Sequence, residues 1–181
     1  MPSDFLYREA TSADVPAMAR CRAADPEAGP ADERMARYLD GDHHPQGALA
    51  PRTAFVALGS GEVVAYIAGH ATTRRLRSDL LVSDPNAVMG YECEGEVQYL
   101  YVSPTVRRRG VASELLRRLA GWFEQRGIRR VCVNVDVESP AATPFYVAAR
   151  GRPLNRHWYV WDDIRSVSTA DGGGRTVVRS R

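Results

Sequence analysis

The chain has 181 residues, of which 44% are apolar and 25% charged, and its formal net charge at pH 7 is +2. This composition is typical of one globular domain, and so small a net charge gives no whole-chain electrostatic basis for binding nucleic acid or a membrane surface. The three cysteines share no metal-binding or redox spacing, no apolar run is long enough to span a bilayer, and no secretory signal pattern is present. We therefore expect a cytoplasmic protein without a metal site.

The first half of the chain predicts a strand, two helices and a β-hairpin. Thr11-Ser12-Ala13-Asp14 followed by Pro16 is a helix-start signal, and Gly59-Ser60-Gly61 is a tight turn between two β-prone segments. The expected elements are a strand at 5–10, a helix that begins at 11–14, a weaker helix at 31–39 and hairpin strands at 53–58 and 63–68. Residues 71–90 follow as a long irregular connector, and connections of this length in a compact domain are often functional or mobile.

One stretch in the second half joins a predicted strand at 94–102 to a predicted amphipathic helix at 111–125. Three arginines and a glycine lie between them, at 107–110. A turn from a strand into a helix exposes unpaired backbone N–H groups and the positive end of the helix dipole, and both attract phosphate. The stretch from Val102 to Ser113 therefore predicts a site for the pyrophosphate of a large anionic cofactor, with a solvated basic turn as the alternative.

Simple alternation along the strand at 94–102 assigns its side chains to two faces of the sheet. The residues expected on one face are Val97, Tyr99 and Tyr101. The residues expected on the other face are Glu96, Gln98, Leu100 and Val102. Glu96 and Gln98 should therefore point the same way.

The last third of the chain predicts a parallel crossover, a short helix and a closing strand. The β-branched run at 131–135 follows the helix, so that strand, helix and strand form a right-handed crossover. Ser139 is expected to cap a short helix with Pro140 in its first turn and Gly151 at its end, and a final strand spans 157–162. The expected organisation is a single domain over 1–165 and a flexible glycine-rich tail over 166–181.

Two motifs on these elements resemble those of the GNAT superfamily of acyl-CoA-dependent N-acetyltransferases. The first motif, Gln or Arg, two residues, Gly, one residue, then Gly or Ala, is matched by Arg107, Gly110 and Ala112, after Val102-Ser103-Pro104. The second, Asn, two residues, Ala, two residues, Phe-Tyr and a later Gly-Phe, is matched by Ser139, Ala142, Phe145-Tyr146 and Gly151-Arg152. Two departures are Ser139 in place of Asn and Arg152 in place of Phe. The resemblance covers about residues 5–162.

The resemblance implies a mixed α/β fold. Its central sheet would have six to seven mostly antiparallel strands, splayed between strands 4 and 5 and flanked by about four helices. Acetyl-CoA is the implied cosubstrate, with its pyrophosphate on the loop and helix start and its pantetheine arm along the preceding strand, and no metal is implied. The implied cofactor-binding residues are Leu100, Tyr101, Val102, Arg107, Arg108, Arg109, Gly110, Val111, Ala112, Ser113, Ser139 and Tyr146.

Amide formation needs a neutral amine, because an ammonium has no lone pair, and a base or a water-linked carboxylate helps to remove its proton. By resemblance, Glu96 is the expected general base, and Gln98 could bind the substrate or a water. Tyr146 is at the position of the family's general acid and would protonate the departing thiolate. The structural alternatives are a salt bridge at a strand end for Glu96 and a core tyrosine for Tyr146.

The implied function is transfer of an acetyl group from acetyl-CoA to a primary amine by direct attack in a ternary complex. The acceptor could be a small metabolite, an antibiotic, an amino acid or a protein amine. Two alternatives are a CoA-binding module without catalysis and an acetyltransferase acting on aminoacyl-tRNA. The expected assembly is a monomer or a homodimer, for which a strand carrying Trp158 and Trp161 would suit a dimer edge.

The remaining histidines, arginines and cysteines are expected to have structural roles. The histidines at 43, 44, 70 and 157 are too scattered to indicate a metal site and should lie in loops or at edges. The arginines at 74, 75 and 77 should form a solvated basic patch or, by resemblance, contact an acidic acceptor group. Cys132 should be buried in its strand, whereas Cys93 should be partly exposed.

Overall fold

The computed structural model describes residues 4–24, 34–39, 41, 47–77, 90–137 and 139–167. The strands of its main sheet are β1 (Phe5–Glu9), β2 (Ala48–Gly59), β3 (Glu62–Thr72), β6 (Gly95–Val102), β7 (Val131–Asn134), β8 (Arg152–Pro153) and β9 (Trp158–Trp161). Their spatial order is β1-β2-β3-β6-β7-β9-β8, and every pair is antiparallel except β6 with β7.

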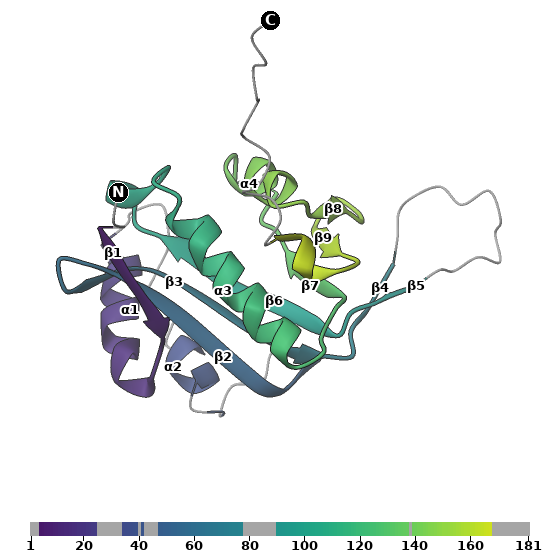
Figure 1. Ribbon diagram of the computed structural model, residues 1–181, viewed down its shortest axis with the longest axis horizontal. Coiled ribbons are helices and arrows are strands. Elements are labelled where there is room, and N and C mark those ends of the chain that lie inside the picture. Colours follow the sequence, from purple (N-terminus) through teal and green to yellow (C-terminus); the bar gives the residue numbers. More distant parts are fainter. Residues whose placement is uncertain are drawn as a thin grey trace, which may run out of the picture.

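Four α-helices flank this sheet (Figure 1). They are α1 (Val15–Ala23), α2 (Arg34–Leu39), α3 (Val111–Gln125) and α4 (Ala142–Ala148). In Figure 1, α3 crosses the front of the sheet and α1 and α2 lie behind it. The predicted fold class, a mixed sheet of six to seven strands with about four helices, is confirmed. Within the described residues, no helix is long and apolar enough to cross a membrane.

The amphipathic pattern of α3 explains the larger of the cores. Its apolar side buries Leu115, Leu116, Leu119 and Phe123, which pack with residues from both halves of the sheet. A second core lies on the opposite face, where Met18 of α1 and Tyr38 of α2 meet β2, β3 and β6. The sheet is therefore covered on both faces, and most residues of its central strand β3 are buried.

The chain enters α1 through a short 3₁₀ turn, η1 (Ser12–Asp14), and the predicted start signal is confirmed. The Asp14 carboxylate accepts a hydrogen bond from the backbone N–H of Thr11 at 2.8 Å and forms two bonds to the Arg8 guanidinium, at 2.6 and 2.7 Å. These hydrogen bonds, above all those from Arg8, hold the pKa of Asp14 well below its usual range. They fix the beginning of α1 against β1.

The strand β6 contains a β-bulge that the alternating pattern did not predict. In its pairing with β3, Tyr99 lies opposite Ala68 and Val97 lies opposite Gly69, so that Gln98 is the extra residue. Tyr99 and Tyr101 consequently pack on the side of α1 and α2, whereas Val97, Leu100 and Val102 pack on the side of α3.

The expectation that Glu96 shares a face with Leu100 and Val102 is therefore wrong. The extra residue of the bulge reverses the alternation, because side chains of a strand change face at every position. Glu96 precedes the bulge and contacts Arg74 and His70, on the same side of the sheet as Tyr99.

Several element boundaries also differ from the prediction. β2 and β3 are longer than expected, and the connector after them contains a two-stranded ribbon of β4 (Arg75–Arg77) and β5 (Gly90–Glu92). This ribbon extends to the right of the sheet in Figure 1. The helix α4 begins at Ala142 with Ala141 as its N-cap, so Ser139 does not cap it. The rest of the predicted connector, 78–89, lies outside the described residues.

Two further expectations, an edge position for the strand with Trp158 and Trp161 and partial exposure of Cys93, are wrong. β9 is not an edge strand, because β8 pairs with it, and Trp161 is only 1% exposed and donates a hydrogen bond to the Ala149 carbonyl. Cys93 is buried rather than partly exposed, and Cys132 is buried as predicted. The 3₁₀ turn η4 (Ile164–Val167) packs on α3 and buries Val167, two residues beyond the expected domain limit. Residues 168–181 of the expected tail lie outside the described residues.

The glycine at the start of β6 gives a test of this packing. A methyl group on Gly95 would lie 2.7 Å from a ring carbon of Phe123 and 2.9 Å from Ile128. We expect Gly95→Ala to lower the free energy of unfolding by roughly 1–3 kcal/mol, the range for overpacked cores. The measurement is urea denaturation followed by circular dichroism.

Gly121 in α3 is the matched control, because its added methyl group would meet no atom within 4 Å. Gly121→Ala should raise the free energy of unfolding by about 0.5–1 kcal/mol, since alanine is the better helix former. Equal effects of the two substitutions would contradict the packing described for Gly95.

Candidate functional site

A cleft opens where β6 and β7 separate. The two strands pair only through Gly95–Val97 and Val131–Val133, after which β6 continues to Val102 beside β3 alone. The cleft has a volume of about 1150 Å³. Its walls come from residues 97–102 of β6, 106–108 and 110–113 at the start of α3, 133–136 after β7, and 139–142, 145 and 146 around α4, together with Arg22 of α1. The predicted splay between the fourth and fifth strands of the sheet is thus observed.

The β6 wall of the cleft carries the residues predicted to hold an extended ligand. Leu100, Tyr101 and Val102 all line it. Beyond Val97, no strand in the described part of the chain pairs with β6 on the side of β7. An extended chain with its own hydrogen-bonding groups can therefore lie along this edge as an added strand does. The Val102 carbonyl already accepts a hydrogen bond from Nε of Arg107 at 3.1 Å.

The turn before α3 has a backbone geometry that suits an anion. Arg108 and Gly110 both adopt positive φ, +60° and +80°, within a short turn that leads directly into the helix. Gly110 is the N-cap, and no side chain of the described residues caps the first N–H groups of α3. Successive backbone N–H groups in such a turn converge on a concave site, and the helix dipole adds to its attraction for negative charge.

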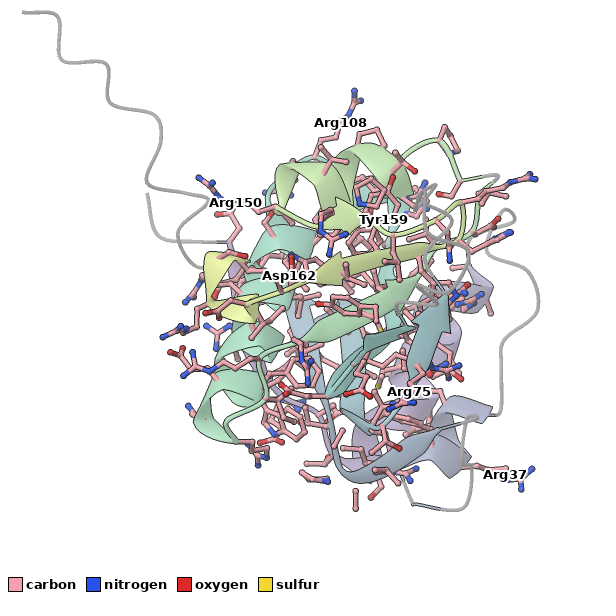
Figure 2. All side chains as sticks on the ribbon, turned by 90° about the vertical axis from the view of Figure 1, so that its right-hand side faces the viewer. Arg37, Arg75, Arg108, Arg150, Tyr159 and Asp162 are labelled. Carbon is pink, nitrogen blue, oxygen red and sulfur yellow. The ribbon has the colours of Figure 1, made fainter. Side chains whose placement is uncertain are left out.

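The three arginines of this turn do not act alike. Arg107 and Arg108 line the cleft, and Figure 2 shows the Arg108 side chain extending outward from the molecule. The Arg109 side chain instead turns toward β1, where its guanidinium pairs with Asp4 at 2.7 Å and lies 4.7 Å from the centre of the Phe5 ring. Arg109 is absent from the cleft wall, so only its backbone remains available to a ligand there.

On the opposite wall, Ser139 and Tyr146 both line the cleft. Tyr146 is nearly buried and packs edge-to-face against Trp161, and this burial raises the pKa of its phenol well above the usual range. The phenol therefore remains protonated at any physiological pH. Arg150 adopts a positive φ at the end of α4. The Gly151 N–H then donates a hydrogen bond to the Tyr146 carbonyl at 2.8 Å, which holds the tyrosine backbone in place.

The two departures from the family's second motif have structural consequences. Arg152, in place of Phe, forms an ion pair with Asp162 at 3.1 Å and lies over the ring of Tyr91, so an exposed polar contact joins β8 to β9. Ser139, in place of Asn, presents a smaller hydroxyl to the cleft without capping α4.

Glu96 lies next to the cleft but is not part of its wall. Its side chain is 5% exposed, and Oε2 accepts a hydrogen bond from Nε of Arg74 at 2.8 Å. Nε2 of His70 lies 3.7 Å from the same oxygen, and Nδ1 of His70 is 3.0 Å from the Tyr38 hydroxyl. The structural alternative for Glu96, a salt bridge, is therefore present, but the bridge is buried rather than at an exposed strand end.

Two of these residues were missed by the sequence analysis. His70 was expected in a loop or at an edge, yet it is fully buried in β3, because this strand runs four residues past its predicted end. Tyr38 was expected only as an apolar residue of a weak helix. Gln98 was expected beside Glu96 and instead faces the cleft, where its Oε1 is buried and has no hydrogen-bond partner among the described residues.

The arrangement can serve acyl transfer from a long anionic donor. One end of the cleft offers backbone N–H groups and two arginines, its middle offers an unpaired strand edge, and a buried phenol and a carboxylate lie near its inner end. Within the described part of the chain, no group of three His, Cys, Asp or Glu side chains is placed to hold a metal ion.

Comparison with known proteins places these features in one family. The sequence profile of the acetyltransferase (GNAT) family matches residues 17–151. A comparison with curated proteins finds no matching sequence. Solved structures with the same fold include an acetyltransferase from Thermus thermophilus, which is 21% identical with a TM-score of 0.57 and 86% and 95% of the two chains covered.

Two archaeal structures share the fold at lower identity. Ard1 from Thermoplasma volcanium is 17% identical, with a TM-score of 0.59 and 87% of this chain and 95% of that chain covered. The PaiA N-acetyltransferase from Thermoplasma acidophilum, solved in complex with coenzyme A, is 11% identical, with a TM-score of 0.56 and 88% and 98% covered. The profile match spans most of the sequence, and this chain therefore belongs to the acetyltransferase (GNAT) family.

Proposed function

We propose that this protein transfers an acetyl group from acetyl-CoA to a primary amine by direct attack in a ternary complex. The observation that carries the proposal is the continuous cleft, which runs from the anion-binding turn before α3 along the open edge of β6 to the point where β6 meets β7. Bound acetyl-CoA would supply an acetyl group activated as a thioester. No covalent enzyme intermediate is required, and both buried cysteines are absent from the cleft wall.

The proposed cofactor contacts follow the walls of the cleft. The backbone of Leu100, Tyr101 and Val102 would pair with the pantetheine arm, and Ser139 would contact it from the other side. Backbone N–H groups of the 109–113 segment would hold the pyrophosphate, through Arg109, Gly110, Val111, Ala112 and Ser113. Arg107 and Arg108 would add side-chain contacts, which are roughly twice as strong for a charged pair as for a neutral one. The Arg109 side chain would take no part, because it is held by Asp4.

Glu96 would accept the proton of the incoming amine. Since Glu96 is not part of the cleft wall, we propose that the proton reaches it through one intervening water, a geometry that general bases commonly use. Gln98 Oε1 would accept a hydrogen bond from the amine N–H, because this buried oxygen has no hydrogen-bond partner among the described residues. A buried acceptor left unpaired is costly, so a donor from the substrate is favourable there.

Tyr146 would protonate the departing thiolate. Its phenol lines the cleft opposite β6, and the raised pKa of the phenol keeps its proton in place until the leaving group needs it. The hydrogen bond from Gly151 to the Tyr146 carbonyl and the contact with Trp161 hold the ring in position. Among the described residues, no other tyrosine lines the cleft from the α4 side.

The proposed activity is tested by measuring acetyl-CoA binding and turnover together. We expect acetyl-CoA to bind in isothermal titration calorimetry, and a panel of primary amines to include at least one that accelerates release of the CoA thiol. Binding without turnover on any amine would favour a CoA-binding module without catalysis. A complex with tRNA that weakens with salt would instead favour an aminoacyl-tRNA acceptor. Absence of acetyl-CoA binding would contradict the proposal at its first step.

The anion-binding turn can be tested through Gly110. The Gly110→Asp substitution places a side chain and a negative charge at the N-terminus of α3, where the pyrophosphate is proposed to lie. We expect the dissociation constant for acetyl-CoA to rise at least 100-fold, because the substitution both blocks and repels the anion. Calorimetric titration measures this change.

Gly61 in the turn between β2 and β3 gives a matched control for Gly110. Its φ is +85°, close to the +80° of Gly110, and an added Cβ meets no atom within 4 Å at either glycine. Gly61→Asp should therefore carry a similar conformational cost and leave acetyl-CoA affinity unchanged. Equal acetyl-CoA affinities for Gly110→Asp and Gly61→Asp would contradict pyrophosphate binding at this turn.

The role of Glu96 has a pH signature. Glu96→Gln should lower kcat/KM about 100-fold at neutral pH, within the range for loss of a general base. The loss should shrink as pH rises, because the amine then loses its proton to solvent. The control is Glu92→Gln on β5, which removes the exposed carboxylate that pairs with Arg75 of β4. Glu92→Gln should leave the pH profile unchanged. An equal loss at every pH would show that Glu96 positions the substrate and takes no proton.

A further inference from the structure

Glu96, the proposed base, belongs to a largely buried chain of polar side chains, and His70 and Tyr38 in this chain have no role in the proposed function. Its members are Tyr38 of α2, His70 of β3, Glu96 of β6 and Arg74, which follows β3. The Tyr38 hydroxyl lies 3.0 Å from Nδ1 of His70, Nε2 of His70 lies 3.7 Å from Oε2 of Glu96, and Nε of Arg74 lies 2.8 Å from the same oxygen. Tyr38 and His70 are both 0% exposed.

The surroundings select one tautomer of His70. Burial, above all, raises the pKa of the Tyr38 phenol far beyond its usual range, so this hydroxyl remains a donor. If Tyr38 donates to Nδ1, the proton of neutral His70 lies on Nε2 and points at the Glu96 carboxylate. The other tautomer would turn the lone pair of Nε2 toward a negative oxygen, which is repulsive. The chain therefore runs in one direction, from Tyr38 through His70 to Glu96.

Both groups that approach the carboxylate do so at the same oxygen. The closest atom of Glu96 to Arg74 and to His70 is Oε2 in each case. Among the hydrogen bonds of the described residues, none reaches Oε1. One oxygen is thus held from two sides, and the other is left for a ligand or water. The 3.7 Å separation is longer than a hydrogen bond, as is common for catalytic groups before substrate binds.

We infer that His70 and Tyr38 are positioning residues, which hold Glu96 through Oε2 so that Oε1 receives the proton of the acceptor amine. This inference rests on the proposed function, because it assigns a role only if Glu96 is the base. Stability alone does not explain why these polar side chains are buried, because a buried ion pair is often no more stabilising than apolar residues of similar size. Precise placement of a reactive group by a second layer of contacts is a better-supported reason.

Other titratable groups around the chain do not compete for this role. Arg52 of β2 lies over the Tyr38 ring at 5.0 Å from its centre, and Tyr99 of β6 packs edge-on against Tyr38. Cys132 of β7 lies near Glu96 and Arg74. A hydrogen bond with Cys93, together with burial, raises the pKa of the Cys132 thiol far above its usual range. Arg52 is therefore a cationic neighbour of these side chains, on the side of Tyr38.

The decisive experiment compares two substitutions of His70. His70→Leu removes the ring nitrogen that lies 3.7 Å from Oε2 of Glu96, and we expect kcat to fall about tenfold while KM for acetyl-CoA stays unchanged. The pH profile of kcat/KM should also differ from that of the wild-type protein, because the proposed base loses a neighbour at Oε2. His70→Gln keeps an N–H donor at a similar reach but cannot take up a proton, and it should restore most of the activity and the wild-type pH profile.

A smaller change at Tyr38 gives a second measurement should either His70 variant fold poorly. Tyr38→Phe removes only the hydroxyl and should lower kcat several-fold with a shifted pH profile. Tyr91→Phe is its control, since it also removes a phenolic hydrogen bond, to the Trp161 carbonyl at 2.9 Å, but away from Glu96. Tyr91→Phe should leave the pH profile unchanged.

The outcomes separate this inference from the proposed function. If the wild-type protein turns over an amine and His70→Gln is as impaired as His70→Leu, then His70 carries the proton itself and the positioning role is overturned. An unchanged pH profile in His70→Leu and Tyr38→Phe would also overturn it while leaving the proposed function intact. Absence of turnover by the wild-type protein on every amine would overturn both.

Discussion

The site depends on the early separation of two parallel strands. β6 and β7 share only three residue pairs, because each is bound more extensively to another partner. β6 stays paired with β3 as far as Val102, while β7 pairs with β9 along its whole length, and the Val135 N–H then bonds the His157 carbonyl at 2.7 Å. The core under α3 contains residues from both sides of the split, among them Val97 and Val133, and this shared core joins the two halves. The opening is therefore part of the fold itself, and a ligand can pair with the free edge of β6 without displacing a strand.

The bulge at Gln98 gives Glu96 and Gln98 different environments beside the cleft. A regular strand would place Glu96 and Gln98 on one face and would give neither residue a distinct environment. With one inserted residue, Gln98 lines the cleft while Glu96 lies beside Arg74 and His70. A carboxylate held by protein contacts and an amide in the cleft wall thus come from positions only two residues apart. The bulge interrupts regular pairing at one position and gives these two groups different environments.

The elements proposed to bind the acetyl donor could be predicted from the sequence because their determinants are local. The helix at 111–125 was predicted to the residue, since its amphipathic pattern, Gly110 and Gly127 lie within a few turns of one another. The acceptor side could not be predicted in the same way. The contacts of Glu96 come from His70 and Arg74, 26 and 22 positions away in the chain, and Tyr38, which contacts His70, is 58 positions away. No local pattern records these contacts. Alternation also carries no trace of a bulge, so the faces of β6 were misassigned. The Arg109 side chain was missed for a similar reason, because its partner Asp4 lies more than 100 residues away.

Arg74 connects Glu96, the proposed base, to the β4–β5 ribbon, which is a separate two-stranded sheet. Its backbone is held on both sides, since its N–H bonds Thr72 Oγ1 at 3.2 Å and its carbonyl accepts from the Cys93 N–H at 2.8 Å, at the root of the β4–β5 ribbon. Its guanidinium binds Glu96 and also lies 5.1 Å from the centre of the Trp158 ring. A buried carboxylate that lost this partner would be left with an uncompensated charge, which is far more costly than the pair is favourable. The ribbon and the carboxylate must therefore be built together.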